Sequence, residues 1–364
     1  MQILTKRKID ISKPEIGDEE KQAVMEVLDS GMLVQGEKVK QFEEDFADYC
    51  GVDHAIATSN GTTALSVALM AHDIHAGDEV IIPSFTFMAT ATSVLSVGAI
   101  PVFVDIEPDT FSITPDAIEA VITDKTRAVM PVHLYGHPAY VKEIAELCKK
   151  YNLVLIEDSA QAHGAAVDGK RVGSFGTGCF SFYPSKNMTT GEGGIVTTND
   201  ETVAAKARMA RNHGMNTRYL HESIGFNYRM TNISAAIGIE QLKKLPRWTQ
   251  QRIANASYLS ENIKTVKVPT VRDGCEHVFH QYTVVTPDGI NRDDAVQYLN
   301  DNGIGARVYY PTPIHMQPIM TAFVSDDLDL PVTEDLRHRV FSLPVHPALK
   351  QADLEYIVAY VNQL

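Results

Sequence analysis

Short apolar runs rich in β-branched residues alternate with helical patterns through the first two-thirds of this 364-residue chain. The runs predict strands at 79–83, 101–106, 127–133, 153–158, 179–183 and 194–198. Patterns typical of helices lie between them, at about 88–97, 115–122, 139–150 and 201–211. This alternation predicts an α/β fold, a mainly parallel sheet with helices on both faces. Because such sheets bind ligands at the carboxyl ends of their strands, residues that follow a strand are the first candidates for a site.

The pattern changes after about residue 245. A long helical stretch at 233–264 is followed by patterns that predict a strand at 281–287, a helix at 292–303, a strand at 306–311 and a terminal helix at 352–364. We therefore predict a large domain over residues 1–245 and a smaller α+β domain over residues 246–364. The N-terminal segment is expected to pack near the smaller domain.

Charge and spacing argue against several classes of function. The net charge is −14 and no basic run offsets it, so nucleic acid is not expected as a partner. The 13 histidines and 4 cysteines show no metal-ligand spacing, so no metal is expected. The longest uncharged run, between Glu79 and Asp105, is broken by prolines, a glycine and Ser/Thr residues, so no membrane span is expected. The N-terminus carries no apolar leader segment, which favours the cytoplasm.

The segment 180–194, FSFYPSKNMTTGEGG, places one amine, Lys186, between a predicted strand and a glycine-rich loop. A lysine that attacks carbonyl groups must lie in a sheltered pocket, where its neutral form is accessible. The loop lets the backbone approach a ligand closely. Taken alone, a lysine at such a place is more often a solvated surface group, and GEGG can be only a turn.

Two further stretches carry polar residues at predicted element ends. Asp158 ends the strand 153–158, and Gln161 lies three residues on. A buried carboxylate needs a cation or hydrogen-bond donors; the partner is a protonated ring nitrogen, or the carboxylate caps the following turn. Asn60 and Gly61 open a helix whose first amides can bind an anion, or simply form a capped helix end.

The chain has no dinucleotide fingerprint, P-loop or G-x-S-x-G elbow. The lysine, the carboxylate with its neighbouring glutamine and the anion site instead suit one ligand. A phosphorylated pyridine aldehyde needs an amine for a Schiff base, a carboxylate on its ring nitrogen and an anchor for its phosphate. The combination points to pyridoxal 5′-phosphate as the cofactor.

Eight motifs extend this interpretation over nearly the whole chain, from about ISKPEIGDEE to SLPVHPAL. In order they are SNGTTAL, PSFTFMATATSV, GAIPVFVDIEPDT, PVHLYGHP, IEDSAQAHGA, FYPSKNMTTGEGG, NYRMTNISAAIGIEQL and YYPTPIH. They resemble the DegT/DnrJ/EryC1/StrS family of sugar aminotransferases. The resemblance implies the type I fold of pyridoxal phosphate-dependent transferases and the amination of nucleotide-linked keto-sugars.

The resemblance also assigns roles around the cofactor ring. Lys186 matches the lysine that forms the Schiff base and moves the proton. Asp158 matches the acid on the ring nitrogen, and Gln161 matches the side chain near the ring hydroxyl. Phe87 falls where the family stacks an aromatic ring on the cofactor.

At the phosphate end, Gly61, Thr62 and Ser181 match the family's phosphate contacts. Asn227 matches a residue that reaches the phosphate of the neighbouring subunit's cofactor. The resemblance therefore implies an obligate homodimer with shared active sites.

The implied reaction is a ping-pong transfer of an amino group from L-glutamate to a nucleotide-linked keto-deoxysugar, in amino-sugar or surface-glycan biosynthesis. The motifs VHLYGHP, QAHGA and YRMTN favour the subgroup that resembles perosamine synthases, which aminate C4 of a GDP-linked 4-keto-6-deoxymannose. Candidate substrate contacts are Arg229, Arg307, Tyr309, Tyr310 and His315. Strand packing is the alternative for Tyr309, and an interface salt bridge the alternative for Arg229.

Two other functions stay open. Family members with histidine in place of Lys186 are sugar dehydratases, and a few members have regulatory roles. A pyridoxal phosphate-dependent dehydratase or a non-catalytic, cofactor-binding regulatory protein is therefore the alternative.

Overall fold

The computed structural model describes residues 7–325 and 327–364. Its centre is a seven-stranded sheet of order β1-β9-β8-β5-β4-β2-β3. The strands are β1 (His54–Thr58), β2 (Glu79–Pro83), β3 (Ile100–Val104), β4 (Thr126–Val129), β5 (Val154–Asp158), β8 (Thr177–Ser181) and β9 (Gly194–Thr198). β9 runs antiparallel to β1 and β8, and the remaining neighbouring pairs are parallel. This confirms the predicted mainly parallel sheet.

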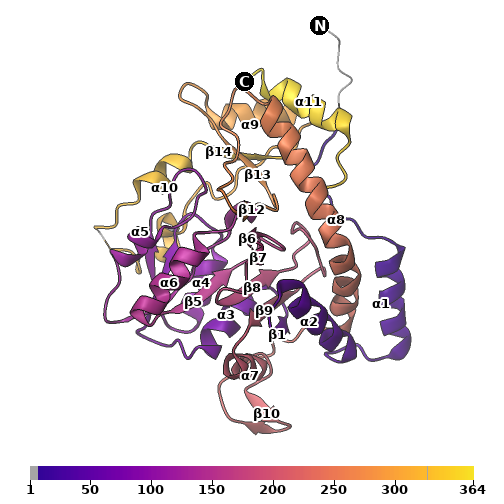
Figure 1. Ribbon diagram of the computed structural model, residues 1–364, viewed down its shortest axis with the longest axis vertical. Coiled ribbons are helices and arrows are strands. Elements are labelled where there is room, and N and C mark those ends of the chain that lie inside the picture. The colour runs from indigo at the N-terminus through magenta and orange to yellow at the C-terminus, as the bar shows by residue number, and fades with distance from the viewer. Residues whose placement is uncertain (1–6, 326) are drawn as a thin grey trace.

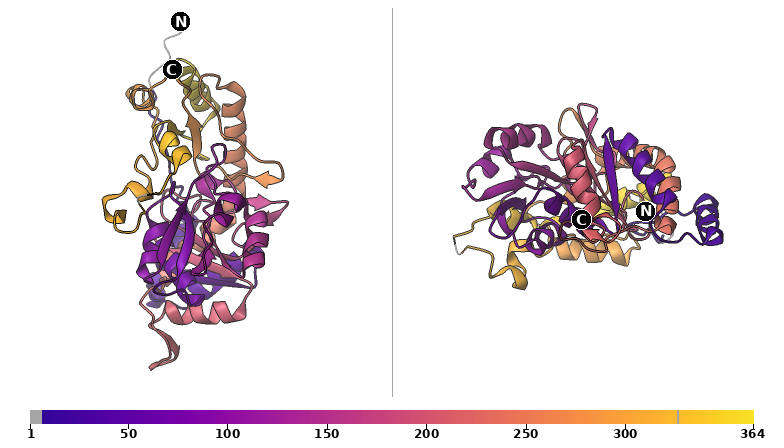
Figure 2. Two further views of the ribbon diagram at one scale, coloured as in Figure 1. Left: turned by 90° about the vertical axis from the view of Figure 1, so that its left-hand side faces the viewer. Right: turned by 90° about the horizontal axis from the view of Figure 1, so that it is seen from below.

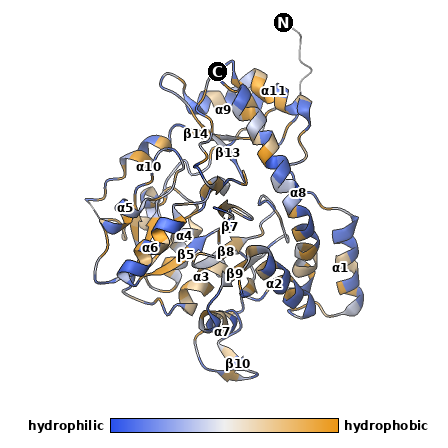
Figure 3. Ribbon diagram, viewed as in Figure 1, coloured by the Kyte–Doolittle hydropathy of each residue, from blue (hydrophilic) through white to orange (hydrophobic). Residues whose placement is uncertain are grey.

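Helices cover both faces of the sheet (Figure 1). One face packs against α3 (Gly61–Ala71), α4 (Ala89–Ser96) and α7 (Glu201–Ala210). The other packs against α2 (Glu37–Cys50), α5 (Pro115–Glu119), α6 (Val141–Tyr151) and the first half of α8 (Asn232–Asn262). The sequence of α6 explains its packing on the sheet. Its apolar residues lie on one side of the helix and its charged residues on the other (Figure 3).

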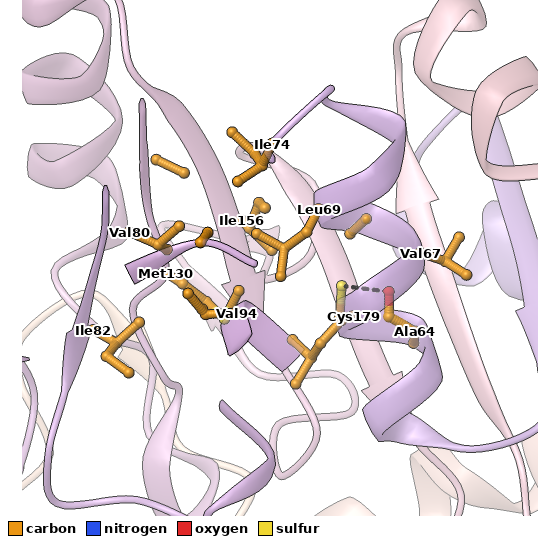
Figure 4. Close-up of a cluster of buried hydrophobic side chains, with 14 of the residues drawn as sticks. Ala64, Val67, Leu69, Ile74, Val80, Ile82, Val94, Met130, Ile156 and Cys179 are labelled. Carbon is orange, nitrogen blue, oxygen red and sulfur yellow. Dashed lines mark hydrogen bonds between the residues drawn. The ribbon is translucent and has the colours of Figure 1, made fainter. Parts of the chain in front are cut away.

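The strand side chains alternate between these two cores. Ile82, Ile156 and Cys179 enter the core under α3, whereas their chain neighbours Ile81 and Leu155 enter the opposite core. Figure 4 shows the first core, where the Cys179 thiol donates to the Ala64 carbonyl at 3.6 Å. The alternation matters for the site, because Asp158 follows Ile156 by two residues and shares its face.

The C-terminal third builds a separate apolar cluster around β13 (Tyr282–Val285), β14 (Val340–Leu343), α9 (Arg292–Asp301) and α11 (Gln351–Val361). The 31-residue helix α8 connects the two parts and contains Pro246 in its interior (Figure 1). Ile9 pairs with Ile304 and joins this cluster. The division at residue 245 stays a prediction.

Other segments extend the two parts. α1 (Asp18–Ser30) packs on α8, and α10 (Pro331–Leu336) lies against the sheet core. β6 (Ala166–Val167), β7 (Lys170–Arg171) and β12 (Cys275–Glu276) form a small sheet. β10 (Met215–Thr217) and β11 (Leu220–His221) form a hairpin that projects from the body (Figure 2).

Two differences from the predicted elements are informative. The short, alanine-containing strand β1 was not predicted. The strand predicted at 306–311 is wrong, since Arg307 makes only an isolated bridge with Ser342. Tyr310 has a φ of 62°, which a strand cannot contain, so the chain turns there and enters the sheet domain.

The described part of the chain contains no helix long and apolar enough to cross a membrane. Within the same residues, no group of three or more His, Cys, Asp or Glu side chains is arranged to hold a metal ion.

The core on the α3 face predicts that truncating a buried valine lowers stability more than truncating an exposed one. Val67 is 0% exposed and Val271 is 43% exposed. We expect Val67→Ala to lower the free energy of unfolding by about 2–3 kcal/mol, because buried methyl groups are lost and a cavity remains. The matched change Val271→Ala should cost less than about 0.5 kcal/mol. Urea unfolding monitored by circular dichroism measures both, and equal losses would contradict the core assignment.

Candidate active site

A cavity of about 620 Å³ lies at the carboxyl edge of the sheet. Its wall comes from segments that follow β1, β2, β4, β5 and β8, together with residues of the C-terminal third. Nine of the predicted site residues line it: Gly61, Thr62, Phe87, Asp158, Gln161, Ser181, Lys186, Tyr309 and Tyr310. The sheet topology thus gathers residues that are up to 249 positions apart, from Gly61 to Tyr310, around one space.

Lys186 lies just beyond β8, where its backbone amide donates to the Tyr183 carbonyl at 2.8 Å. Its side chain is partly buried in the cavity wall. Removal from water lowers the pKa of the amine to about 8, while the negative charge of Asp158 opposes this change. The amine is therefore about half neutral near pH 8, whereas an ordinary lysine with a pKa of about 10.4 is almost fully charged. This is the state that a nucleophilic lysine needs.

Asp158 closes β5 and is 5% exposed. One carboxylate oxygen, Oδ2, accepts from Thr90 Oγ1 at 2.9 Å, and Oδ1 accepts from the Ala160 amide at 3.2 Å. Burial raises the pKa of the carboxyl, and the two hydrogen bonds and the charge on Lys186 act against it. The bond to Ala160 is a turn cap, as one interpretation from the sequence expected. Asp158 also lines the cavity, and a ring nitrogen as its partner stays a prediction.

The first turn of α3 forms the anion end of the cavity. Asn60 caps the helix through Oδ1, which accepts from the Thr63 amide at 2.9 Å. The amides of Gly61 and Thr62 precede Ala64, whose amide donates to the Asn60 carbonyl at 3.1 Å in the first bond of the helix, so they are left for a ligand. A Cβ at Gly61 would lie 2.6 Å from the Ser181 Cβ, so only glycine lets the helix start reach the end of β8.

Both polar atoms of the Gln161 side-chain amide form hydrogen bonds. Its Oε1 accepts from the Tyr135 amide at 2.7 Å, and its Nε2 donates to the Tyr310 hydroxyl at 2.8 Å. Burial raises the pKa of the Tyr310 phenol, so the hydroxyl remains protonated. These bonds fix the amide in the wall and bring the Tyr310 ring into the cavity.

Below the cavity, the fully buried carboxylate of Glu157 collects four hydrogen bonds. It accepts from His133 Nε2 at 3.1 Å and from the amides of Gly173, Phe175 and Gly176 at 2.7–2.9 Å. His133 Nδ1 accepts from a backbone amide, so Nε2 carries the proton of a neutral ring. The arrangement ties the segments before β8 and after β4 to β5.

Three predicted residues lie outside this cavity. Asn227 is exposed and pairs with Asn212 near the projecting hairpin. Arg229 donates to the Asn212 side chain at 2.6 Å. Arg307 is exposed and pairs through its backbone with Ser342. None of the three is among the residues that line the cavity of their own chain.

His315 also lies outside the cavity wall and has structural partners instead. Its Nδ1 lies 2.6 Å from the buried Ser84 hydroxyl, which also accepts from the His315 amide at 3.1 Å. Its Nε2 faces Glu334 at 3.4 Å. The ring therefore fastens the segment after Tyr310 to the end of β2.

Sequence reasoning missed several residues of the site. Thr90 bonds Asp158, and Tyr183, Glu192 and His280 line the cavity. Glu192 and Tyr183 lie in the quoted segment around Lys186, so their position beside the lysine was a usable signal. Thr90 and His280 had none, because only the tertiary fold brings them close.

The residues present fit pyridoxal phosphate. A low-pKa lysine, a buried carboxylate and a helix start with free amides face one space, and glycine at position 61 leaves room at its anion end.

Known proteins with similar sequences and structures match nearly the whole chain. The model of the DegT/DnrJ/EryC1/StrS aminotransferase family matches residues 14–362. GDP-perosamine synthase of Caulobacter vibrioides is 41% identical over 373 residues, which cover 98% of each protein. A pleiotropic regulatory protein of Geobacillus stearothermophilus is 42% identical over 358 residues, 96% of this chain and 94% of that protein. The crystal structure of S. venezuelae DesV with a ketimine intermediate matches with a TM-score of 0.91 and 37% identity, over 95% and 94% of the two chains. The predicted type I transferase fold is thereby confirmed.

The low pKa of Lys186 predicts selective reactivity. In protein freed of small molecules, acetylation of Lys186 should rise with a midpoint near pH 8, because only the neutral amine reacts. The exposed Lys142, paired with Asp168, is the control and should react with a midpoint above its usual value. Asp158→Asn should move the Lys186 midpoint to lower pH, since a charge that stabilises the ammonium is lost. Peptide mass spectrometry after brief labelling measures each midpoint. A Lys186 midpoint equal to that of Lys142 would contradict the assignment.

Proposed function

Because the chain belongs to the DegT/DnrJ/EryC1/StrS aminotransferase family, we propose that it is a pyridoxal 5′-phosphate-dependent aminotransferase acting on a nucleotide-linked keto-sugar. We propose L-glutamate as the amino donor and a 4-keto-6-deoxyhexose as the acceptor. The observation that carries the proposal is that Lys186, Asp158 and the open helix start at Gly61 all line the same cavity.

The cofactor, when bound, supplies a carbonyl carbon that bonds amines and a ring that withdraws electrons from the reacting carbon. Lys186 would hold it covalently between turnovers. When not bonded to the cofactor, the Lys186 Nζ would be the base that takes a proton from the donor's α-carbon. Its pKa of about 8 suits both removal and return of a proton near neutral pH.

Asp158 would face the ring nitrogen and hold a proton there. A buried carboxylate is stabilised by such a cationic partner, which removes part of the desolvation cost of its charge. Gln161, fixed by its two hydrogen bonds, would lie beside the ring hydroxyl. Phe87 is 61% exposed on the open side of the cavity, where a ring could stack on it.

The phosphate would lie against the amides of Gly61 and Thr62 and the hydroxyl of Ser181. Asn227 would complete this end from a second copy of the chain, which accounts for its exposed position outside its own cavity. The shared site makes the homodimer the active unit.

The acceptor is proposed from the names of the relatives. GDP-perosamine synthase from two organisms and transaminases of dTDP- and UDP-linked sugars are 38–41% identical to this chain. The hydroxyls of Tyr309 and Tyr310 would contact the sugar from the C-terminal side of the cavity. Among the described residues that line the cavity, Lys186 is the one lysine or arginine. The donor carboxylate and the nucleotide phosphates would therefore need Arg229 of a second copy, or Arg307 after movement of its segment.

The two half-reactions test this proposal. We expect L-glutamate to change the absorbance of the cofactor-loaded protein and release 2-oxoglutarate, and one GDP-, UDP- or dTDP-linked keto-sugar to reverse the change. Lys186→Ala should bind the cofactor without a borohydride-reducible bond and lose amino transfer by a factor of at least about 10³. Lys142→Ala, a change at an exposed lysine, should leave both intact. The aminotransferase assignment is wrong if glutamate has no effect on loaded wild-type protein and no keto-sugar is aminated.

A regulatory role is the second candidate, favoured by the name of the Geobacillus relative. It predicts that the cofactor binds through Lys186 while neither half-reaction proceeds. The same absorbance experiment therefore separates the two functions, and the borohydride step shows whether the cofactor was loaded. A dehydratase would instead consume glutamate to release a deoxygenated keto-sugar and ammonia, and no amino-sugar would form.

Sharing of sites between two copies predicts complementation. Lys186→Ala and Asn227→Asp homodimers should each be nearly inactive, the second because a negative charge would face the phosphate. Mixed dimers contain one intact site, so an equal mixture formed by co-expression should regain about a quarter of wild-type activity. Steady-state assays on purified mixtures measure this. No regain in a mixture shown to contain the heterodimer would mean that Asn227 serves its own chain.

A further inference from the structure

Thr90 lies directly behind the carboxylate that the proposed function depends on. It occupies the first turn of α4 and is 0% exposed. Its Oγ1 lies 2.9 Å from Asp158 Oδ2, although the two residues are 68 positions apart in the chain. α4 covers the same sheet face as Ile156, two residues before Asp158 on β5, so the contact follows from the sheet topology.

The direction of this hydrogen bond is fixed by chemistry. An ionised carboxylate can only accept, so the Thr90 hydroxyl donates to Asp158. The Thr90 oxygen can in turn accept from the Thr86 hydroxyl, 3.4 Å away, and Thr86 lines the cavity. The chain of hydroxyls points its protons toward Asp158, and each bond polarises the next.

The two bonds to Asp158 also fix its orientation. Thr90 holds Oδ2 and the Ala160 amide holds Oδ1, so rotation of the carboxylate would break both. The remaining lone pairs stay available on the cavity side. Thr90 supplies the one side-chain hydrogen bond to Asp158 that the described residues provide.

Other groups near Asp158 do not replace this donor. Lys186 faces it as a cation whose charge is partly lost near pH 8. His133 is neutral, because its Nδ1 accepts from a backbone amide. Burial raises the pKa of both Cys179 and Tyr310, so they too are neutral.

We propose that Thr90 is a positioning residue, which keeps Asp158 ionised and oriented so that it can hold a proton on the ring nitrogen of the cofactor. The second half of this statement rests on the proposed function; the hydrogen bond to Asp158 does not. Loss of the bond removes a charge-assisted interaction that lowers the pKa of Asp158, so the pKa of the carboxyl rises further.

The variants Thr90→Val, Thr90→Ser and Thr92→Val test the proposal. Valine keeps the shape of threonine and removes the hydroxyl, while serine restores the donor. Thr92 is an exposed threonine of the same helix that bonds only to carbonyls of its own first turn, and is the matched control. Thr90→Ala replaces Thr90→Val if circular dichroism shows that the valine variant is not folded.

Without cofactor, the readout is the acetylation midpoint of Lys186. Thr90→Val should lower it in the same direction as Asp158→Asn and by less, because a carboxyl that is protonated or rotated away stabilises the ammonium less. Thr90→Ser and Thr92→Val should match wild type. An unchanged midpoint in Thr90→Val, with a lowered midpoint in Asp158→Asn, would overturn the role of Thr90 whatever the protein's function.

With ¹⁵N-labelled pyridoxal phosphate bound, the readout is the nitrogen chemical shift of the ring. The ring nitrogen should stay protonated in wild type and lose its proton about one to two pH units earlier in Thr90→Val. Serine should restore the wild-type profile. A wild-type profile in the valine variant would overturn the proposal. If no variant, wild type included, binds the cofactor, the proposed function fails while the acetylation result still decides whether Thr90 holds Asp158.

Discussion

The buried carboxylate of Glu157 is the interaction on which the rest of the site depends. It has no exposed surface, and its donors among the described residues are the His133 ring and three backbone amides. Those partners belong to the segment after β4 and to the turn that leads into β8. Side chains alternate along β5, so Glu157 and Asp158 point to opposite faces of the strand. Glu157 binds these two segments on one face, and Asp158 lines the cavity on the other. Glu157, the residue before Asp158, thus holds β5 in place next to the cavity.

Burial acts in opposite directions on Lys186 and Asp158, two of the ionisable groups that line the cavity. It lowers the pKa of the Lys186 amine and raises the pKa of the Asp158 carboxyl, and each group's charge partly offsets the effect on the other. In a site with only the lysine, the pKa of the amine would be lower and a larger fraction of it would be neutral. A site with only the carboxylate would hold a more readily protonated acid. The pair therefore tunes the amine to near-neutral pH, and hydroxyl and amide donors keep the acid charged.

The sequence was sufficient for the fold class and for the residues at strand ends. Lys186 and Asp158 could be found because each follows a strand with a clear apolar pattern and stands beside a distinctive neighbour. Thr90 could not, because a threonine inside a helix has no local mark, and only the order β5-β4-β2 brings α4 over the end of β5. The strand predicted at 306–311 failed for a related reason. Its alternating pattern is real, but the bond between Gln161 and Tyr310 and the left-handed backbone at Tyr310 turn the chain toward the cavity. His315 lies against Ser84 and Glu334, and its predicted contact with a substrate stays a prediction.

The fastening of residues 310–316 to the sheet determines which part of the cavity wall is fixed. The Ile314 amide donates to the Ser84 carbonyl, His315 holds the Ser84 hydroxyl, and Asp105 at the end of β3 caps α10 through the amides of Val332 and Thr333. Although Tyr310 comes from the C-terminal third of the chain, the segment that follows it is therefore bonded to the ends of β2 and β3 in the central sheet. Phe87, Tyr183 and Glu192 are exposed residues of the cavity wall, so this side of the cavity faces solvent while the Tyr310 side is closed by the chain.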